Sequence, residues 1–387
     1  MNSKPKDYKK NWFQQNPKKS LAAVILFLIL VLTVATEKFL GWQNRRNGIF
    51  LEAEPRYIRL KEYRPGTQLM LGFPKEHLKY TDNVFRKRYP LRIDAEGFIM
   101  PSQKHQHPDA MIVFLGGSTT ECMYMDEEKR FPYVVGTILE QKTGKKINSY
   151  NAGMSGNNSL HSIDILVNKV IPLKPQVVVF MENINDLSVL VYEGTYWNRN
   201  TSRSPIETLA RVKLVGKFLK EILIPNLNYA YRSLKKTLSQ KEGDEFAGAR
   251  GKKLQLDKER LIKEYEMNLQ AIVSLCRAWG TNPVLMTQAN RVTANPDPVV
   301  SAYLGRYGSE TGLSYAEFKD LYDSFNEAIR RVGQRNEVIV IDLASEVPQD
   351  KKYLYDMVHF NDFGSQYAAG IIAARLEPLI KNKMQGR

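Results

Sequence analysis

A serine, an aspartate and a histidine stand in short loops where acyl-transfer chemistry could use them. Ser118 follows Gly116-Gly117 directly after an apolar run, and the two glycines let the backbone turn tightly and leave the hydroxyl exposed. Near the C-terminus, Asp356 precedes His359 by three residues. The carboxylate can fix the imidazole tautomer, and the imidazole can take a proton from a serine hydroxyl. These residue types favour a nucleophilic serine, although each loop alone also fits a capping turn.

Two further loops carry groups that can stabilise an oxyanion. Gly153 lies in the glycine-bearing segment 151–158, whose amides could face the same crevice, and a simple turn is the alternative. Asn185 follows another apolar run, where its side-chain amide can donate to a developing oxyanion. Its neighbour Asp186 can hold the loop or cap a helix. The order of the four loops therefore matters more than any one of them.

The elements that must position these loops alternate regularly from Ala110 onward. Short apolar runs predict buried strands, and the longer periods between them predict helices. The predicted strands are 110–115, 146–152, 176–180, 283–287 and 338–342, and the predicted helices lie near 127–143, 159–171, 257–279, 315–334 and 363–382. Such alternation predicts a parallel five-stranded sheet with helices on both faces, in a three-layer α/β/α domain. Ligands bind beyond the carboxyl ends of such strands, where the serine, glycine and asparagine loops begin.

The four loops, in this order, resemble the four sequence blocks of the SGNH/GDSL hydrolase superfamily. Those blocks supply a nucleophilic serine, a glycine, an asparagine and a final Asp-x-x-His, which look like Ser118, Gly153, Asn185 and Asp356 with His359. The resemblance covers about residues 110–382, and the last block is its most specific part. It implies a flavodoxin-like fold, a Ser-His-Asp triad and no metal or organic cofactor. It also implies an oxyanion hole made by the amides of Ser118 and Gly153 and the side chain of Asn185.

Two positions depart from the family pattern. Gly117 stands where the family motif Gly-Asp-Ser has an aspartate, a change that leaves the nucleophile in place. Asn183 stands where a glycine usually precedes x-Asn-Asp. The second departure concerns the local shape of the loop, and therefore the depth of the oxyanion pocket.

The N-terminal segment predicts a membrane anchor. Residues 1–46 hold nine Lys or Arg against two acidic residues, so that +7 of the formal charge of +15 lies there. The apolar run Leu21–Ala35 follows, and a helix continued to Trp42 spans about 30 Å. Because the lysines precede this run, we expect a cytoplasmic basic tail over 1–20, a single-pass anchor over 21–42 and an extracytoplasmic domain after it.

A cleaved signal peptide is the alternative to an anchor, since an apolar run of this length is also typical of signal sequences. Val34-Ala35-Thr36-Glu37 is a poor small-residue cleavage site, and the basic region before the run is unusually long. Both observations favour an uncleaved anchor. The basic N-terminus then fits an anionic lipid surface.

Composition narrows the remaining classes. The 387 residues are 43% hydrophobic and 25% charged, which excludes disorder and collagen, and the mean hydropathy of −0.39 excludes many membrane spans. Cys122 and Cys276 are expected to be free thiols in apolar surroundings. No basic stripe interleaved with aromatics follows the N-terminal block, so nucleic acid is not an expected partner.

The domain organisation follows from these patterns. We expect an irregular stalk or lid over 43–108 and the hydrolase-like domain over 109–387. A helical insertion over 189–256 interrupts the alternation. Its Lys/Arg-rich part, 206–238, is expected to form solvated helices with an apolar side on the domain; the alternatives are that it covers the site, binds a partner or faces the membrane.

Three functions remain open on the sequence alone. The first is a membrane-anchored serine esterase that removes acetyl or another short acyl group from an envelope glycan through an acyl-enzyme. The second is an O-acyltransferase of an exopolysaccharide or cell-wall polymer, which uses the same triad and needs a membrane partner as acyl donor. The third is a non-catalytic binding protein that keeps the fold and uses the insertion 189–256 as its partner surface.

Overall fold

The computed structural model describes residues 11–47, 60–82, 84, 87–102, 104–198, 223–238 and 256–382. The chain divides into two compact units, one made of 1–51 with 209–243 and the other of 52–208 with 244–387. The basic tail before residue 11 and most of the predicted insertion, 199–222 and 239–255, lie outside the described residues. Each unit is described by itself below.

The larger unit is built on a parallel five-stranded sheet, as the sequence predicts. Its strands are β3 (Ala110–Gly116), β4 (Ile147–Asn151), β5 (Val177–Met181), β6 (Asn282–Met286) and β7 (Ile339–Ile341), in the spatial order β4-β3-β5-β6-β7. β3 pairs with β4 through Val113 and Tyr150, and with β5 through Val113 and Val178. The strand order reverses at β3, so the chain after β3 enters the crevice where such folds bind ligands.

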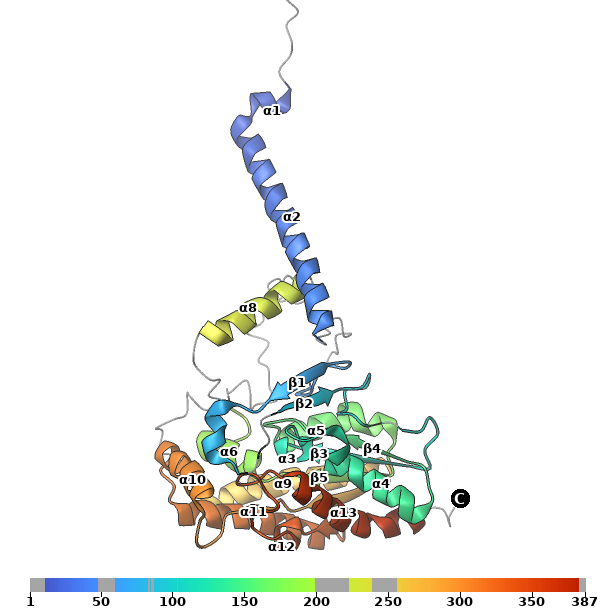
Figure 1. Ribbon diagram of the computed structural model, residues 1–387. Coiled ribbons are helices and arrows are strands. Elements are labelled where there is room, and N and C mark those ends of the chain that lie inside the picture. Colours follow the sequence, from blue (N-terminus) through green and yellow to red (C-terminus); the bar gives the residue numbers. More distant parts are fainter. Residues whose placement is uncertain are drawn as a thin grey trace, which may run out of the picture. The chain divides into compact units, whose positions relative to one another are not determined.

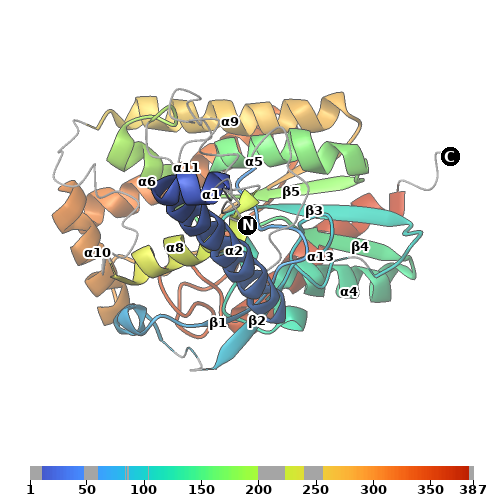
Figure 2. The same cartoon turned by 90° about the horizontal axis from the view of Figure 1, so that it is seen from above.

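Helices cover both faces of this sheet (Figures 1 and 2). α4 (Phe131–Thr143) and α13 (Asp362–Asn382) lie on one face, over a core that includes Ile112 and Phe114 of β3. α5 (Ser159–Ile165), α9 (Lys258–Ala278) and α11 (Tyr315–Arg335) lie on the other face, over Val113 and Leu115. Alternate residues of one buried strand thus serve the two cores, which explains why its sequence is apolar throughout.

The remaining helical elements of this unit are short or lie at its rim. They are α3 (Ser118–Glu121), η1 (Lys75–Tyr80), η2 (Glu127–Lys129), the π-helical turn η3 (Leu166–Val170), η4 (Ile171–Leu173), α6 (Ile184–Glu193), α10 (Pro298–Thr311) and α12 (Leu343–Glu346). The sequence analysis predicts neither α6 nor α10. α6 extends into the segment predicted as an insertion, because residues 184–192 are all buried and belong to the core of the sheet domain.

Residues 60–102, which the sequence indicates as part of a stalk or lid, are tied into the sheet domain. β1 (Gln68–Gly72) and β2 (Arg88–Arg92) form an antiparallel pair, and the Ile99 amide donates to the Asn151 carbonyl at the end of β4 at 2.9 Å. The buried Arg130 guanidinium donates to the carbonyls of Met100 at 2.8 Å and Pro90 at 2.5 Å. Removing this segment would therefore take two carbonyl acceptors from a buried cation and leave it the Cys122 carbonyl, 3.3 Å from Nε.

The smaller unit contains α1 (Trp12–Gln15), α2 (Pro17–Arg46) and α8 (Pro225–Leu238). α2 is long and apolar enough to cross a membrane, and its apolar side chains are exposed. The Glu37 carboxylate near its C-terminal end accepts hydrogen bonds from the Asn226 and Leu227 amides of α8, both at 2.8 Å. Asn44 donates to the Asn226 side chain at 2.7 Å. A carboxylate thus satisfies two orphan amides at the start of α8.

Candidate active site

Ser118, His359 and Asp356 form one continuous hydrogen-bonded chain. His359 Nε2 lies 2.8 Å from Ser118 Oγ, and His359 Nδ1 lies 2.7 Å from Asp356 Oδ2. Asp356 Oδ1 also accepts the backbone amides of Val358 at 2.9 Å and His359 at 2.8 Å. Ser118 and His359 are 241 positions apart in the sequence, yet the fold brings them into contact. The predicted nucleophile, base and orienting carboxylate therefore meet.

The loop that carries the imidazole is braced on itself. The Tyr355 amide donates to the His359 carbonyl at 2.9 Å, and Leu354 bridges to Phe360 in antiparallel fashion. The Tyr355 ring stacks on the imidazole, with ring centroids 5.5 Å apart and an interplanar angle of 8°. A base held this way loses little further freedom when it accepts a proton, which is the preorganisation that proton transfer needs.

The pKa shifts within this chain have opposite signs. Burial alone would raise the pKa of Asp356, but the His359 ring and the two backbone amides outweigh burial and lower it. Burial would lower the pKa of His359, but the Asp356 carboxylate, and to a lesser degree Glu121, raise it above its usual value. Asp356 therefore stays ionised next to an imidazole whose protonated form it favours.

Asn185 lies beside the nucleophile turn, where the sequence predicts it. A Cβ built on Gly117 would stand under 3.0 Å from Asn185 Nδ2, so the amide reaches the residue immediately before Ser118. Asn183, the departure from the family glycine, has φ −157° and ψ −64°, a backbone that needs no glycine. Its side chain donates to the Tyr322 carbonyl at 3.0 Å, so it is bound to α11. The loop therefore accommodates an asparagine at this position.

Gly153, the predicted second amide of the oxyanion hole, is bound elsewhere in the structure. Its amide donates to Asn151 Oδ1 at 2.9 Å. Its missing side chain lets β4 approach α3, because a Cβ there would stand under 3.0 Å from the Glu121 amide nitrogen. The residue that touches the nucleophile loop comes four positions later, since the Asn157 carbonyl lies 3.0 Å from a Cβ built on Gly117. Gly156, at φ +76°, directly precedes Asn157.

Asp186 has a structural partner, as one of its two predicted roles requires. Its carboxylate accepts the Ser159 amide at 3.1 and 3.0 Å, the Ser159 hydroxyl, and the Tyr196 hydroxyl at 2.5 Å. Ser159 begins α5, so Asp186 satisfies an orphan amide at the N-terminus of that helix. The carboxylate thereby fixes the distance between the Asn185 loop and the 151–158 loop.

Sequence reasoning misses a second buried carboxyl, Glu121, behind the nucleophile. Tyr63 and Ser155 both donate hydroxyl hydrogen bonds to it. Burial raises the pKa of Glu121, and these two donors only partly offset that effect. The segment that carries Tyr63 also contacts the 151–158 loop, because Lys61 Nζ donates to the Gly156 carbonyl at 2.8 Å. Only the position of Glu121, three residues after Ser118 on the first turn of α3, could have drawn attention to it.

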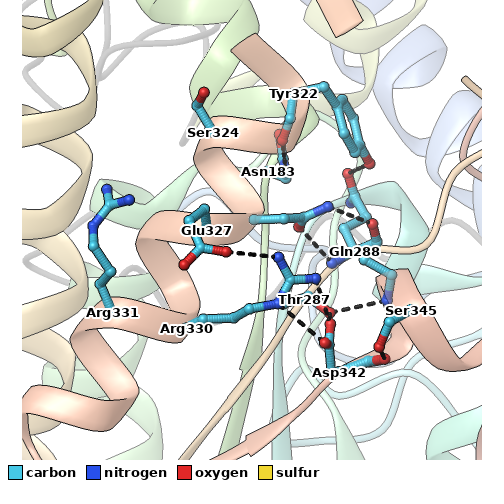
Figure 3. Close-up of polar contacts among 12 residues, drawn as sticks. Asn183, Thr287, Gln288, Tyr322, Ser324, Glu327, Arg330, Arg331, Asp342 and Ser345 are labelled. Atoms are coloured by element: carbon cyan, nitrogen blue, oxygen red, sulfur yellow. Dashed lines mark hydrogen bonds and ion pairs between the residues drawn. The ribbon is translucent and has the colours of Figure 1, made fainter. Parts of the chain in front are cut away.

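The Gln288 side chain, labelled in Figure 3, connects three helices near the site, α3, α6 and α11. It follows β6, and its Nε2 donates to Thr119 Oγ1 at 2.8 Å. Its Oε1 accepts the Tyr322 hydroxyl at 2.6 Å and the Ile184 amide at 3.1 Å. All four residues are buried. The side chain next to Ser118 is therefore connected to α6 and α11 through one amide group.

An ion pair between Arg330 and Asp342 holds α11 at the carboxyl ends of β6 and β7 (Figure 3). Arg330 of α11 donates to both carboxylate oxygens of Asp342, at 3.0 and 2.8 Å, just after β7. The Thr287 hydroxyl at the end of β6 donates to the same carboxylate at 2.7 Å. A two-pronged contact of this kind restricts geometry more than a single one. It holds α11 against the strand ends from which Gln288 projects.

The two thiols and the acidic residues offer no other reactive centre among the described residues. Cys122 and Cys276 are buried and free, and burial raises the pKa of each to about 12. Within the described ranges, no three His, Cys, Asp or Glu side chains group in a way that could hold a metal ion. The reactive groups of the described structure thus centre on Ser118.

One family model and several solved structures match the chain. The model of the GDSL-like lipase/acylhydrolase family matches residues 114–367, more than half of the chain. The lipase/acylhydrolase from Enterococcus faecalis is 16% identical, covers 70% of this chain and 96% of its own, and has a TM-score of 0.40. Axe2, an acetylxylan esterase from Geobacillus stearothermophilus, is 16% identical, covers 70% and 94%, and has a TM-score of 0.38. No curated protein matches the chain. The chain belongs to the GDSL-like lipase/acylhydrolase family and is a hydrolase that acts on ester bonds.

Proposed function

We propose that the protein is a serine esterase that uses Ser118, His359 and Asp356 as a catalytic triad. The observation that carries this proposal is the unbroken chain of contacts from Ser118 Oγ through the imidazole to Asp356, at 2.8 and 2.7 Å. A serine hydroxyl is a weak nucleophile at its own pKa, and an adjacent base held by a third group is what activates it.

The reaction then proceeds in two halves. His359 takes the Ser118 proton while Ser118 Oγ attacks the ester carbonyl, and His359 returns that proton to the leaving alcohol as the carbonyl–alkoxy bond breaks. Water enters next and gives a proton to His359. The resulting hydroxide oxygen attacks the acyl-enzyme, and Ser118 leaves with the proton from His359. Asp356 stabilises the imidazolium at both steps.

The oxyanion of each tetrahedral intermediate needs preformed donors. We assign this role to the Ser118 amide and the Asn185 side chain, with an amide from the 151–158 loop as the third. Because the Gly153 amide donates to Asn151, Gly156 replaces Gly153 as the candidate for that third donor. Removal of one such donor typically lowers kcat by about a hundredfold to a thousandfold.

The proposed substrate is an envelope glycan that carries a short acyl ester, with acetyl as the favoured acyl group. Support comes from the ester chemistry of the family together with the expected topology, in which α2 anchors the chain and the lysines before it keep the N-terminus cytoplasmic. The hydrolase domain is then exported and faces acylated carbohydrate of the cell surface. Nucleic acid has no place in this proposal.

The direct test uses the full chain in detergent micelles with p-nitrophenyl acetate and a serine-directed fluorophosphonate. We expect turnover and a label on Ser118, and we expect Ser118→Ala to lose both while its thermal unfolding stays near that of the wild type. Asp164→Asn, which changes a half-buried carboxyl of α5, is the matched control. A folded wild type with neither turnover nor label would contradict the esterase proposal and favour a binding role.

The same experiment separates a hydrolase from an O-acyltransferase. Both pass through an acyl-enzyme, and they differ in whether water or a sugar hydroxyl removes the acyl group. Added carbohydrate should leave acetate release unchanged if water is the acceptor. Acetylated sugar formed at the expense of acetate would instead identify a transferase, which would then require a membrane partner as acyl donor.

A further inference from the structure

Glu182 is a buried carboxyl that touches the proposed oxyanion donor directly. It follows β5, and its side chain has an exposed fraction of zero. Glu182 Oε1 accepts the Asn185 side-chain amide at 3.2 Å and the backbone amides of Asn183 at 3.1 Å and Asn185 at 3.4 Å. Because an acid oxygen faces Asn185, the NH₂ end of that amide must point to this side of the loop.

The other oxygen of Glu182 lies beside the nucleophile turn. A Cβ built on Gly117 would stand under 3.0 Å from both Glu182 Oε2 and Asn185 Nδ2, closer than real Cβ atoms come. The space next to Gly117 is therefore filled by a carboxyl from β5 and by the amide it holds. Gly117 is where the family motif has an aspartate, so in this chain a carboxyl reaches the same place from a different strand.

The surroundings of Glu182 contain negative and neutral groups. Asp186, on the same turn, carries a negative charge that acts on Glu182. The Tyr265 hydroxyl of α9 donates to the Glu182 backbone carbonyl at 2.5 Å, and Tyr322 of α11 also faces the carboxyl. Within the described residues, Glu182 forms no ion pair and its Oε2 has no hydrogen-bond partner. Burial, and then the charge of Asp186, raise the pKa of Glu182 to about 8.

We propose that Glu182 is a positioning residue that must be a neutral carboxylic acid for the enzyme to work. Neutral, it fixes the NH₂ end of Asn185 beside Ser118 without placing a charge near the oxyanion. When Glu182 is ionised, its negative charge contacts the Asn185 amide that must stabilise the oxyanion. The two negative charges repel each other in a buried site where water does not screen them. This inference rests on the proposed esterase function.

The pH profile of kcat/KM is the measurement that isolates this role. The wild type should gain activity as His359 loses its proton, at a pH above that of an ordinary histidine, because the pKa of His359 is raised. It should lose activity again above about pH 8 as Glu182 ionises. Glu182→Gln keeps an acceptor for Asn185 and cannot ionise, so the fall on the alkaline side should disappear.

A second variant separates orientation from charge. Glu182→Ala removes the acceptor, and we expect kcat for p-nitrophenyl acetate at pH 7 to fall by about tenfold to a hundredfold with little change in KM, since Asn185 then turns freely. Glu182→Gln should stay within about threefold of the wild type at the same pH. A merely structural role would lower thermal stability in both variants without moving the pH profile.

Asp164→Asn is again the control, because burial raises the pKa of Asp164 too but its carboxyl has no contact with Asn185. Its alkaline limb should match the wild type. An alkaline limb that persists in Glu182→Gln would overturn the inference while leaving the esterase function intact. A wild type that neither turns over nor labels at Ser118 would overturn the esterase function itself, so the two failures are distinguishable.

Discussion

Ser118 and His359 meet because two loops from opposite ends of the domain finish at the same sheet edge. The hydroxyl, imidazole and carboxylate are then held by backbone as much as by side chains, since Asp356 accepts two amides of its own loop. Two buried carboxyls flank the nucleophile turn, Glu121 on the β4 side and Glu182 on the β5 side. Burial raises the pKa of both, which limits the negative charge around a site that must itself develop an oxyanion.

Gly117 offers the sharpest prediction at this scale. An alanine there would force its Cβ into Asn185 Nδ2 and Glu182 Oε2, the ends of two buried side chains. Overfilling of this kind costs about 1–3 kcal/mol of stability, and displacing Asn185 removes an oxyanion donor. We expect Gly117→Ala to lower kcat by about a hundredfold, measured with p-nitrophenyl acetate. Gly144→Ala, with open space around its Cβ but φ +68°, is a control that should lose stability only. Equal kcat in the two variants would contradict the prediction.

At the scale of elements, periodicity predicts the sheet well because strands buried on both faces are apolar throughout. The five predicted strands and the final helix all exist, with ends shifted by a few residues. α6 is not predicted, because residues 184–192 are all buried, polar ones included, so no exposed polar face marks this helix in the sequence. α10 follows a proline-rich loop that resembles irregular chain, although Asp297 caps it.

The candidate site also contains residues that the sequence predicts and residues that it does not. Ser118, Asp356, His359 and Asn185 are predictable because their types and order match a chemical task. Glu182 and Gln288 are not, since their roles depend on which loops of the folded chain touch. Spacing alone does not reveal that the Gly153 amide donates to the Asn151 side chain, while the Asn151 carbonyl accepts the Ile99 amide.

The junction of α2 and α8 supports a prediction about an element. Glu37 accepts the first amides of α8, and Gly41 gives room for the Asn226 side chain, whose Nδ2 lies 3.1 Å from a Cβ built there. Loss of a capping acceptor costs about 0.5–2 kcal/mol. Glu37→Ala should therefore speed hydrogen exchange at the Asn226 and Leu227 amides by about threefold to thirtyfold, measured by mass spectrometry.

The control for that measurement is an exposed threonine on the same helix, Thr36→Ala, which contacts no residue of α8 in the described structure. Exchange in α8 should not change in that variant. Unchanged exchange in Glu37→Ala would mean that the start of α8 is satisfied without the carboxylate, and the two helices would then be independent elements.

At the scale of the whole molecule, function depends on which side of a membrane the hydrolase domain occupies. The apolar side chains of α2 are exposed, as Leu26 at 67% and Leu32 at 65% show, and such a surface favours an apolar environment. Of the nine Lys or Arg in residues 1–46, six precede the apolar run and three follow it. With this excess on the N-terminal side, the positive-inside rule predicts that the hydrolase domain lies outside.

Topology is therefore the last prediction, and it decides the class of substrate. We express the chain in cells with an N-terminal epitope tag. We expect the protein to remain in the membrane fraction after washing at alkaline pH and to keep its tag. Protease added outside the cells should digest the hydrolase domain. Leu28→Arg with Leu32→Arg should release the protein from the membrane, because each arginine at a helix centre costs about 2.5–3.5 kcal/mol on insertion. Met267→Arg, at an exposed site of α9, is the control. A soluble, shortened protein without its tag would instead identify a cleaved signal peptide, and a protected domain would exclude glycans of the cell surface.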